Sequence, residues 1–270
     1  MLTEKFFDAG SLKINYAEGP ANGTPLVLLH GGTARWQELN PLITGLERNW
    51  HVYAVDLRGH GKSDRATSYR VVDFVPDIVA FIRDQIGAPT VLAGHSLGSL
   101  VSIGTATLIP DLIQNLILLD PPLYLREESI KSNYVYDYFR GVYAYLTKQR
   151  TAQEVLSELF PGITEEGVRN MEAGLSCVDP IFVNTLLEDC LMEGWDIQAS
   201  LESILCPTLL LYGEIEKGAV VRDGDVEFFR KHISIGQEFQ IKDASHLLQV
   251  DQPAHVLDVI SEFLEKILGG

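Results

Sequence analysis

The stretch that decides the fold is Gly94-His95-Ser96-Leu97-Gly98. It follows a short apolar run at residues 89–93, typical of a buried strand, and precedes residues 99–108, which have the character of a helix. A strand that turns into a helix through G-x-S-x-G strains the serine backbone. It also needs glycines on both sides, because other side chains would collide with the neighbouring strand or helix. We therefore expect Ser96 to stand above a sheet, where the N–H of Leu97 and the helix dipole favour negative charge.

The composition predicts one large α/β unit. The chain has 270 residues, of which 46% are hydrophobic, enough for one domain or one domain with an insertion. From about residue 25 onward, strand-like runs alternate with helix-length segments, which predicts a parallel sheet covered on both faces. The net charge of −16 argues against binding to nucleic acid or to an anionic membrane, because both would be repelled.

The cysteines and the N-terminal residues give an expectation for the cellular location of the protein. The three cysteines are odd in number and contain no CxxC pair, so we expect neither a disulfide framework nor a zinc site, and no metal. Residues 1–8 carry charges and lack the apolar core of a signal peptide, and no apolar run approaches the length of a membrane span. These features favour a cytoplasmic protein, a monomer or homodimer, without nucleic-acid or membrane partners.

Glycine-rich segments follow two of the predicted strands. The apolar run at residues 25–29 ends in His30-Gly31-Gly32, and ligands bind at the carboxyl ends of strands in open α/β sheets. The N–H of Gly32 is therefore a candidate donor to a developing oxyanion. After the strand at residues 51–57, Asp56 and Arg58 are positioned to pair, and we expect His60 to be structural rather than catalytic.

Residues 123–203 interrupt the strand pattern with segments of helical period. An insertion of this length between two strands is too long for a plain connection. We predict a helical cap here, with a core domain formed by residues 1–122 and 204–270. The cap contains a stripe of tyrosines at helical spacing, some of which should line a pocket. The candidate pocket residues are Trp36, His95, Tyr134, Tyr138 and Tyr145.

The order of the chemical groups along the chain completes the pattern. A strand is expected near residues 207–213 and a last one at 238–242, and His246 follows the last strand. A serine, then an acid, then a histidine is the order of an α/β-hydrolase triad. With the motifs at His30 and Asp56 in register, the whole chain resembles the serine-nucleophile α/β-hydrolases with a helical cap after the sixth strand.

This resemblance implies roles for individual residues. Ser96 would be the nucleophile and His246 the base, with the N–H groups of Gly32 and Leu97 as the oxyanion hole. The family places its acid three residues after the glycine that ends the seventh strand, which makes Glu216 the preferred acid here. The family more often has aspartate at that position, so rivals remain open: Asp120 at the end of the sixth strand, and Glu214, Asp223 and Asp225.

The resemblance also implies an esterase- or lactonase-like activity. We expect hydrolysis of a small carboxylic ester or lactone through an acyl-enzyme, without a metal or organic cofactor. The alternatives are C–C bond hydrolysis, amide hydrolysis or cofactor-free perhydrolysis on the same triad, and a small-molecule receptor with slow turnover. Ser96 argues against an epoxide hydrolase or haloalkane dehalogenase, because those relatives attack through a carboxylate.

Overall fold

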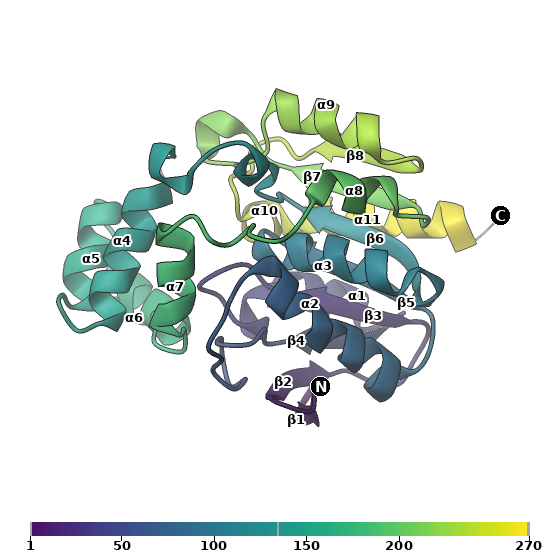
Figure 1. Cartoon of the computed structure of the whole chain (residues 1–270), viewed down its shortest axis with the longest axis horizontal. Coiled ribbons are helices and arrows are strands. Elements are labelled where there is room, and N and C mark those ends of the chain that lie inside the picture. Colours follow the sequence, from purple (N-terminus) through teal and green to yellow (C-terminus); the bar gives the residue numbers. More distant parts are fainter. Residues whose placement is uncertain (1, 134, 269–270) are drawn as a thin grey trace.

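The computed structural model describes residues 2–133 and 135–268, and it is built on one central sheet (Figure 1). The strand order is β1-β2-β4-β3-β5-β6-β7-β8. The first hairpin is antiparallel, β2 pairs antiparallel with β4, and all other neighbours are parallel. The strands are β1 (Thr3–Asp8), β2 (Lys13–Glu18), β3 (Pro25–Leu29), β4 (His51–Val55), β5 (Thr90–His95), β6 (Ile113–Leu119), β7 (Thr208–Tyr212) and β8 (Gly236–Gln240).

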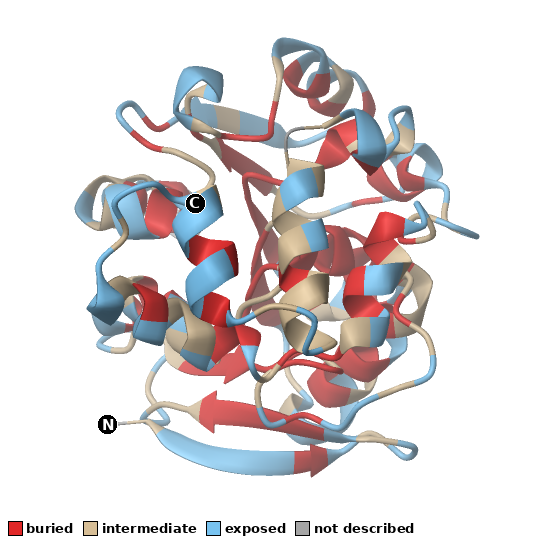
Figure 2. Ribbon diagram, turned by 90° about the vertical axis from the view of Figure 1, so that its left-hand side faces the viewer, coloured by how far each residue is buried: buried red, intermediate tan, exposed pale blue. Residues whose placement is uncertain are grey.

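The central strands are largely apolar because helices cover both faces of the sheet. In β3, Leu26 and Leu28 belong to one core, which also receives side chains from α1 (Asn40–Leu46) and α11 (Pro253–Leu268). Val27 and Leu29 point to the opposite core, shared with α2 (Val71–Ala80) and α3 (Leu97–Leu108). Successive strand residues alternate between faces, so a run without polar residues means two buried faces. Figure 2 shows the buried residues concentrated on the sheet and on the helix sides that face it.

The predicted fold class is confirmed, with shifted helix boundaries. We expect a helix over residues 34–47 from the sequence, and the structure has there a 3₁₀ turn, η1 (Trp36–Leu39), followed by α1. The chain after α2 continues in a wider π-helical turn, η2 (Phe81–Ile86), which ends at Gly87 with φ 64°. The remaining core helices are α8 (Ile197–Glu202), α9 (Asp223–His232) and α10 (Leu248–Asp251), with the 3₁₀ turns η3 (Pro110–Leu112) and η6 (Ile215–Lys217).

The chain segment that connects β6 to β7 forms a separate helical layer, which stands to the left of the sheet in Figure 1. It contains η4 (Leu123–Arg126), η5 (Ile130–Ser132), α4 (Val135–Leu146), α5 (Ala152–Leu159), α6 (Glu165–Leu175) and α7 (Pro180–Leu187). The predicted cap, residues 123–203, includes α8, but this helix packs against α3 and α9 of the core. The helical layer opposite the sheet is thus shorter at its C-terminal end than the predicted segment.

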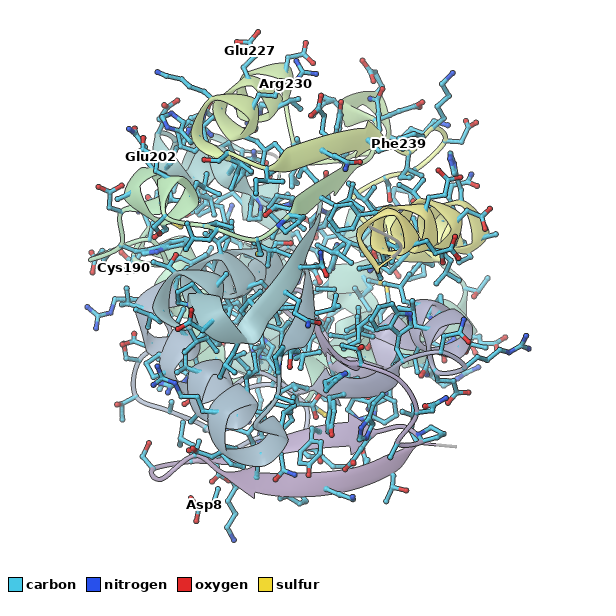
Figure 3. The ribbon with its side chains drawn as sticks, turned by 90° about the vertical axis from the view of Figure 1, so that its right-hand side faces the viewer. Asp8, Cys190, Glu202, Glu227, Arg230 and Phe239 are labelled. Carbon is cyan, nitrogen blue, oxygen red and sulfur yellow. The ribbon has the colours of Figure 1, made fainter. Side chains whose placement is uncertain are left out.

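Charged side chains extend outward around the sheet. Figure 3 shows Asp8 of β1 at one end of the molecule and Glu227 and Arg230 of α9 at the other, with Asp8 and Glu227 pointing away from the body. This placement agrees with a net charge of −16, because ionised groups remain hydrated. Within residues 2–133 and 135–268, no helix has the length and apolar character needed to cross a bilayer.

Candidate active site

Ser96 occupies a strained turn between β5 and α3. Its backbone has φ 52° and ψ −115°, outside the regions that most residues adopt. The flanking glycines are required by contact: a Cβ at Gly94 would lie 2.2 Å from the carbonyl oxygen of Gly98, and a Cβ at Gly98 would lie 2.4 Å from that of Leu29. The steric explanation predicted for the two glycines is therefore confirmed.

Hydrogen bonds hold the strained turn in place. The N–H of Ser96 donates to the carbonyl of Leu119 on β6 at 2.9 Å. The hydroxyl of Ser99 donates to the carbonyl of Gly94 at 2.5 Å and accepts from the N–H of Leu119 at 3.1 Å. A strained residue persists only where its surroundings over-determine it, and these bonds supply that constraint.

His246 is paired with Asp120. The Nδ1 atom of His246 lies 2.7 Å from Oδ2 of Asp120, whose side chain is fully buried at the end of β6. The same carboxylate accepts the N–H groups of Val220 at 2.9 Å and Val221 at 3.4 Å. A carboxylate can only accept here, so Nδ1 carries the proton and Nε2 keeps its lone pair. That is the tautomer a general base needs.

The preference for Glu216 as the partner of His246 is corrected by this geometry. Glu216 is exposed in the turn η6 and forms no hydrogen bond with His246. Glu214 instead accepts the N–H of Asp243 at 3.3 Å, and Asp225 accepts the N–H of Arg222 at 3.0 Å at the start of α9. Asp223 is exposed in the first turn of α9. Of the rival acids, Asp120 is the one beside the imidazole.

Two backbone N–H groups are free near Ser96. Gly32 and Leu97 both line the same cavity as Ser96, and neither N–H has a hydrogen-bond partner among the described residues. The loop that carries Gly32 is fixed by His30. Its Nδ1 lies 2.7 Å from the carbonyl of Gly31, and its Nε2 accepts the N–H of Leu57 at 3.0 Å. Burial lowers the pKa of His30 to about 4, which keeps the ring neutral and able to accept.

His95 connects the strained turn at Ser96 to the loop that carries His246. Its Nε2 lies 2.8 Å from the carbonyl oxygen of His246, and the two rings are 4.6 Å apart. Burial, assisted by the neighbouring His246, lowers the pKa of His95 to about 3. A neutral His95 with its proton on Nε2 therefore donates to the backbone of His246 and helps to position it. On the other side of the loop, Asp251 accepts the N–H of Ser245 at 2.7 Å.

The segment after β4 is organised differently from the sequence-based expectation. Arg58 does not pair with Asp56; its guanidinium binds Asp77 of α2 at 2.6 and 2.7 Å. Asp56 accepts N–H groups from Trp36 at 2.8 Å and Lys62 at 3.0 Å, so it ties the loop after β3 to the loop after β4. His60 is fully buried, and burial lowers its pKa to about 3.

A cavity of about 450 Å³ lies between the strand ends and the helical layer, and Ser96 and His246 both line it. Of the predicted pocket residues, His95 and Tyr138 line this cavity, and the hydroxyl of Tyr138 lies 2.9 Å from Oγ1 of Thr33. Trp36 and Tyr145 do not line it. Trp36 donates through Nε1 to Glu4 at 2.9 Å, and Tyr145 donates to Glu172 at 3.2 Å. Tyr134 lies outside the described residues.

Most of the wall is apolar and was not identified from sequence. It includes four aromatic side chains from four different segments, Tyr124, Phe139, Phe160 and Phe182. Phe182 of α7 reaches the loop that carries Gly32, since a Cβ at Gly32 would lie 3.1 Å from its ring. Phe139 directly follows Tyr138. The tyrosine pattern therefore identified the helix that lines the cavity, but not all of the side chains that face it. No cluster of three or more potential metal ligands occurs within the described residues.

The fold, the elbow and the His246–Asp120 pair define a hydrolase of the α/β class. The chain belongs to the α/β-hydrolase family, whose model matches residues 26–259.

Named relatives in this family differ in their reactions. The chain is 29% identical over 182 residues to 2-(acetamidomethylene)succinate hydrolase of Mesorhizobium japonicum, a match that spans 64% of this chain and 62% of that relative. It is 26% identical to epoxide hydrolase 3 of Xenopus tropicalis, over 96% of this chain and 76% of the relative. The structure of an N-formylmaleamic acid deformylase from Pseudomonas putida S16 superposes with a TM-score of 0.80 at 20% identity, covering 96% of this chain and all of that one. These proteins thus share the fold of this chain and differ in the substrates that their names give.

Proposed function

We propose that this protein is a serine hydrolase that cleaves a carboxylic ester or lactone of a small molecule through an acyl-enzyme. The observation that carries the proposal is the hydrogen bond of 2.7 Å between His246 and the buried carboxylate of Asp120, beside a cavity that also contains Ser96. In the neutral imidazole this pair holds the proton on Nδ1 and directs the lone pair to Nε2, which is the tautomer required to accept the serine proton.

In the proposed first step, Ser96 Oγ attacks the ester carbonyl while its proton moves to Nε2 of His246. The new bond places negative charge on the carbonyl oxygen, which the N–H groups of Gly32 and Leu97 stabilise. Removing one oxyanion donor in comparable sites costs about 10²–10³-fold in kcat. Asp120 stabilises the imidazolium, and the tetrahedral intermediate collapses as His246 gives its proton to the leaving alcohol.

In the second step, His246 takes a proton from water, and the resulting hydroxide attacks the acyl carbonyl. The same two N–H groups stabilise the second tetrahedral intermediate. Its collapse releases the carboxylic acid as the proton returns to Ser96 Oγ. For a lactone, the alcohol and acid are parts of one product.

The cavity wall disfavours a negatively charged acyl group. No arginine or lysine occurs among the described residues that line it, so a substrate with two carboxylates would find no cationic partner there. This feature argues against a succinate like the one in the name of the Mesorhizobium relative, because burying an unpaired carboxylate is costly. Ser96 in the turn between β5 and α3 argues against epoxide opening, because epoxide hydrolases of this family attack through a carboxylate.

The negative charge of −16 supports a protein without nucleic-acid or anionic-membrane partners, and three free cysteines support a cytoplasmic location. We propose both, together with a monomeric or homodimeric state.

Turnover of p-nitrophenyl hexanoate by the wild type and by Ser96→Ala tests the proposed function. We expect many turnovers per wild-type molecule and a loss of about 10⁶-fold in kcat in the variant, as for a removed triad serine. A single turnover would favour the receptor alternative. Turnover of anilides or C–C substrates without any turnover of esters would favour the alternative hydrolases.

A further inference from the structure

One carboxylate faces the cavity. Among the described lining residues, Glu38 is the single aspartate or glutamate, and neither lysine nor arginine is present to balance it. The rest of the wall is largely apolar, so the charge of Glu38 acts in surroundings of reduced polarity, where electrostatic interactions are stronger than in water.

Glu38 lies where the core meets the helical layer. It belongs to η1, whose first N–H, that of Trp36, is held by Asp56 at 2.8 Å. A Cβ at Gly174 of α6 would lie 3.1 Å from Oε1 of Glu38, so the carboxylate contacts the helical layer where that helix has no side chain. Its nearest cation is Arg35, with Nε 3.7 Å away and outside the cavity lining. Partial burial raises the pKa of Glu38, while 44% of its side chain remains accessible to an occupant.

Gln249 supplies an independent observation. It belongs to α10, three residues after His246, lines the same cavity and is 1% exposed. Its Oε1 atom is buried and has no hydrogen-bond partner among the described residues. Buried amide groups are normally paired, so an orphaned one on a cavity wall is suited to a ligand.

We propose that Glu38 and Gln249 form an acceptor subsite that selects esters carrying a hydrogen-bond donor, best a protonated amine, away from the reacting carbonyl, and rejects esters carrying a carboxylate there. This inference rests on the proposed ester hydrolysis and adds the chemical class of the substrate. A protonated amine suits both groups, because an ammonium has three donors and no acceptor and both the carboxylate and the amide oxygen only accept. A carboxylate would instead meet a second carboxylate and an unpaired carbonyl oxygen.

Three esters of one chain length test the proposal: p-nitrophenyl hexanoate, p-nitrophenyl 6-aminohexanoate and the mono-p-nitrophenyl ester of adipic acid. For the wild type we expect kcat/KM to fall in the order amine, neutral, carboxylate, with at least tenfold between the first and the last after subtraction of the uncatalysed rates. In Glu38→Gln the ratio of amine to carboxylate ester should fall at least tenfold. The matched control is Glu227→Gln, which removes the same charge from the exposed face of α9 and should leave the wild-type ratio intact.

Gln249→Met gives a second readout. It removes the unpaired oxygen while keeping the length of the side chain. We expect a lower kcat/KM for the amine ester together with an unchanged or higher melting temperature, because no protein hydrogen bond of Oε1 is lost. An equal ratio of amine to carboxylate ester in the wild type and Glu38→Gln would overturn the subsite, as would a melting temperature several degrees lower in Gln249→Met. If the wild type hydrolysed none of the three esters, the proposed function itself would fail.

Discussion

Replacing Asp120 by asparagine separates the charge of this residue from its shape. In the wild type, Oδ2 of Asp120 accepts both from His246 at 2.7 Å and from Val220 N–H at 2.9 Å. An asparagine can keep an oxygen there only by turning its NH₂ group toward the N–H of Val221, which is 3.4 Å from Oδ1 in the wild type. In the opposite orientation, the NH₂ group meets Val220 and forces the proton of His246 onto Nε2. Both orientations lose the negative charge that stabilises the imidazolium.

We therefore expect Asp120→Asn to lower kcat by on the order of 10⁴-fold, as for the equivalent change in a serine protease triad. That loss corresponds to about 5 kcal/mol of transition-state stabilisation. The donor-to-donor contact should lower the free energy of unfolding by about 1–3 kcal/mol, so the variant should remain folded.

The assay is steady-state hydrolysis of p-nitrophenyl hexanoate, with urea unfolding measured on the same preparations. Glu216→Gln is the matched control, because its side chain is exposed and has no hydrogen bond to His246; it should retain kcat within about twofold. A folded Asp120→Asn variant with nearly normal kcat, combined with a large loss in Glu216→Gln, would refute the reasoning.

Three further outcomes follow from local contacts. Gly98→Ala should destabilise the fold by about 3 kcal/mol or more, because its Cβ would lie 2.4 Å from the carbonyl of Leu29. Gly224→Ala on α9 has open space around its Cβ and should be neutral or stabilising. Urea titration measures the free energy of unfolding of both variants, and equal effects would contradict the packing argument. Tyr138→Phe removes a hydroxyl on the cavity wall and should change the selectivity among short-chain, long-chain and lactone esters. Tyr145→Phe, outside the cavity wall, should leave this selectivity unchanged. Identical selectivity of Tyr138→Phe and the wild type would show that Tyr138 is not part of the acyl site. Lowering the pH from 6.5 to 5 should reduce the free energy of unfolding by up to about 1.4 kcal/mol per pH unit for each buried neutral histidine. The reason is that these histidines bind protons in the unfolded chain but not in the folded one. Unchanged stability over this pH range would contradict the burial of these groups. The three histidines are His30, His60 and His95.

Sequence reasoning was most successful where one local rule determines the outcome. The glycines beside Ser96 have a single steric explanation, and the atoms that a Cβ would meet are those of the adjoining strand and helix. The apolar runs of β3 and of residues 116–119 in β6 likewise indicate strands buried on both faces, since no polar residue interrupts them. The strands depend on the period of the pattern alone, and the glycines depend on the tight turn at Ser96, which brings α3 against β3.

The partner of His246 depends on how distant loops meet, and the local pattern does not encode this. Asp120 has φ 43°, a backbone conformation that aims its carboxylate at Val220 and at His246, 126 residues away. Glu216 stands at a suitable distance along the chain, but the turn η6 leaves it in solvent.

The sequence also did not predict which side chains of the helical layer line the cavity. Tyr138 and Tyr145 lie on one helix, yet one lines the cavity and the other pairs with Glu172 of α6. The two tyrosines are seven residues apart and share a face of that helix, but packing against other helices decides which part of the face meets the cavity.

Covalent trapping of the nucleophile tests the central claim most directly. The wild type, Ser96→Ala and Asp120→Asn are treated with a p-nitrophenyl alkylphosphonate, and the adduct is located by intact mass and peptide mapping. The account predicts one adduct per chain on Ser96, none in Ser96→Ala, and formation at least a hundredfold slower in Asp120→Asn. An adduct on another residue, or equal labelling of Ser96→Ala, would contradict it.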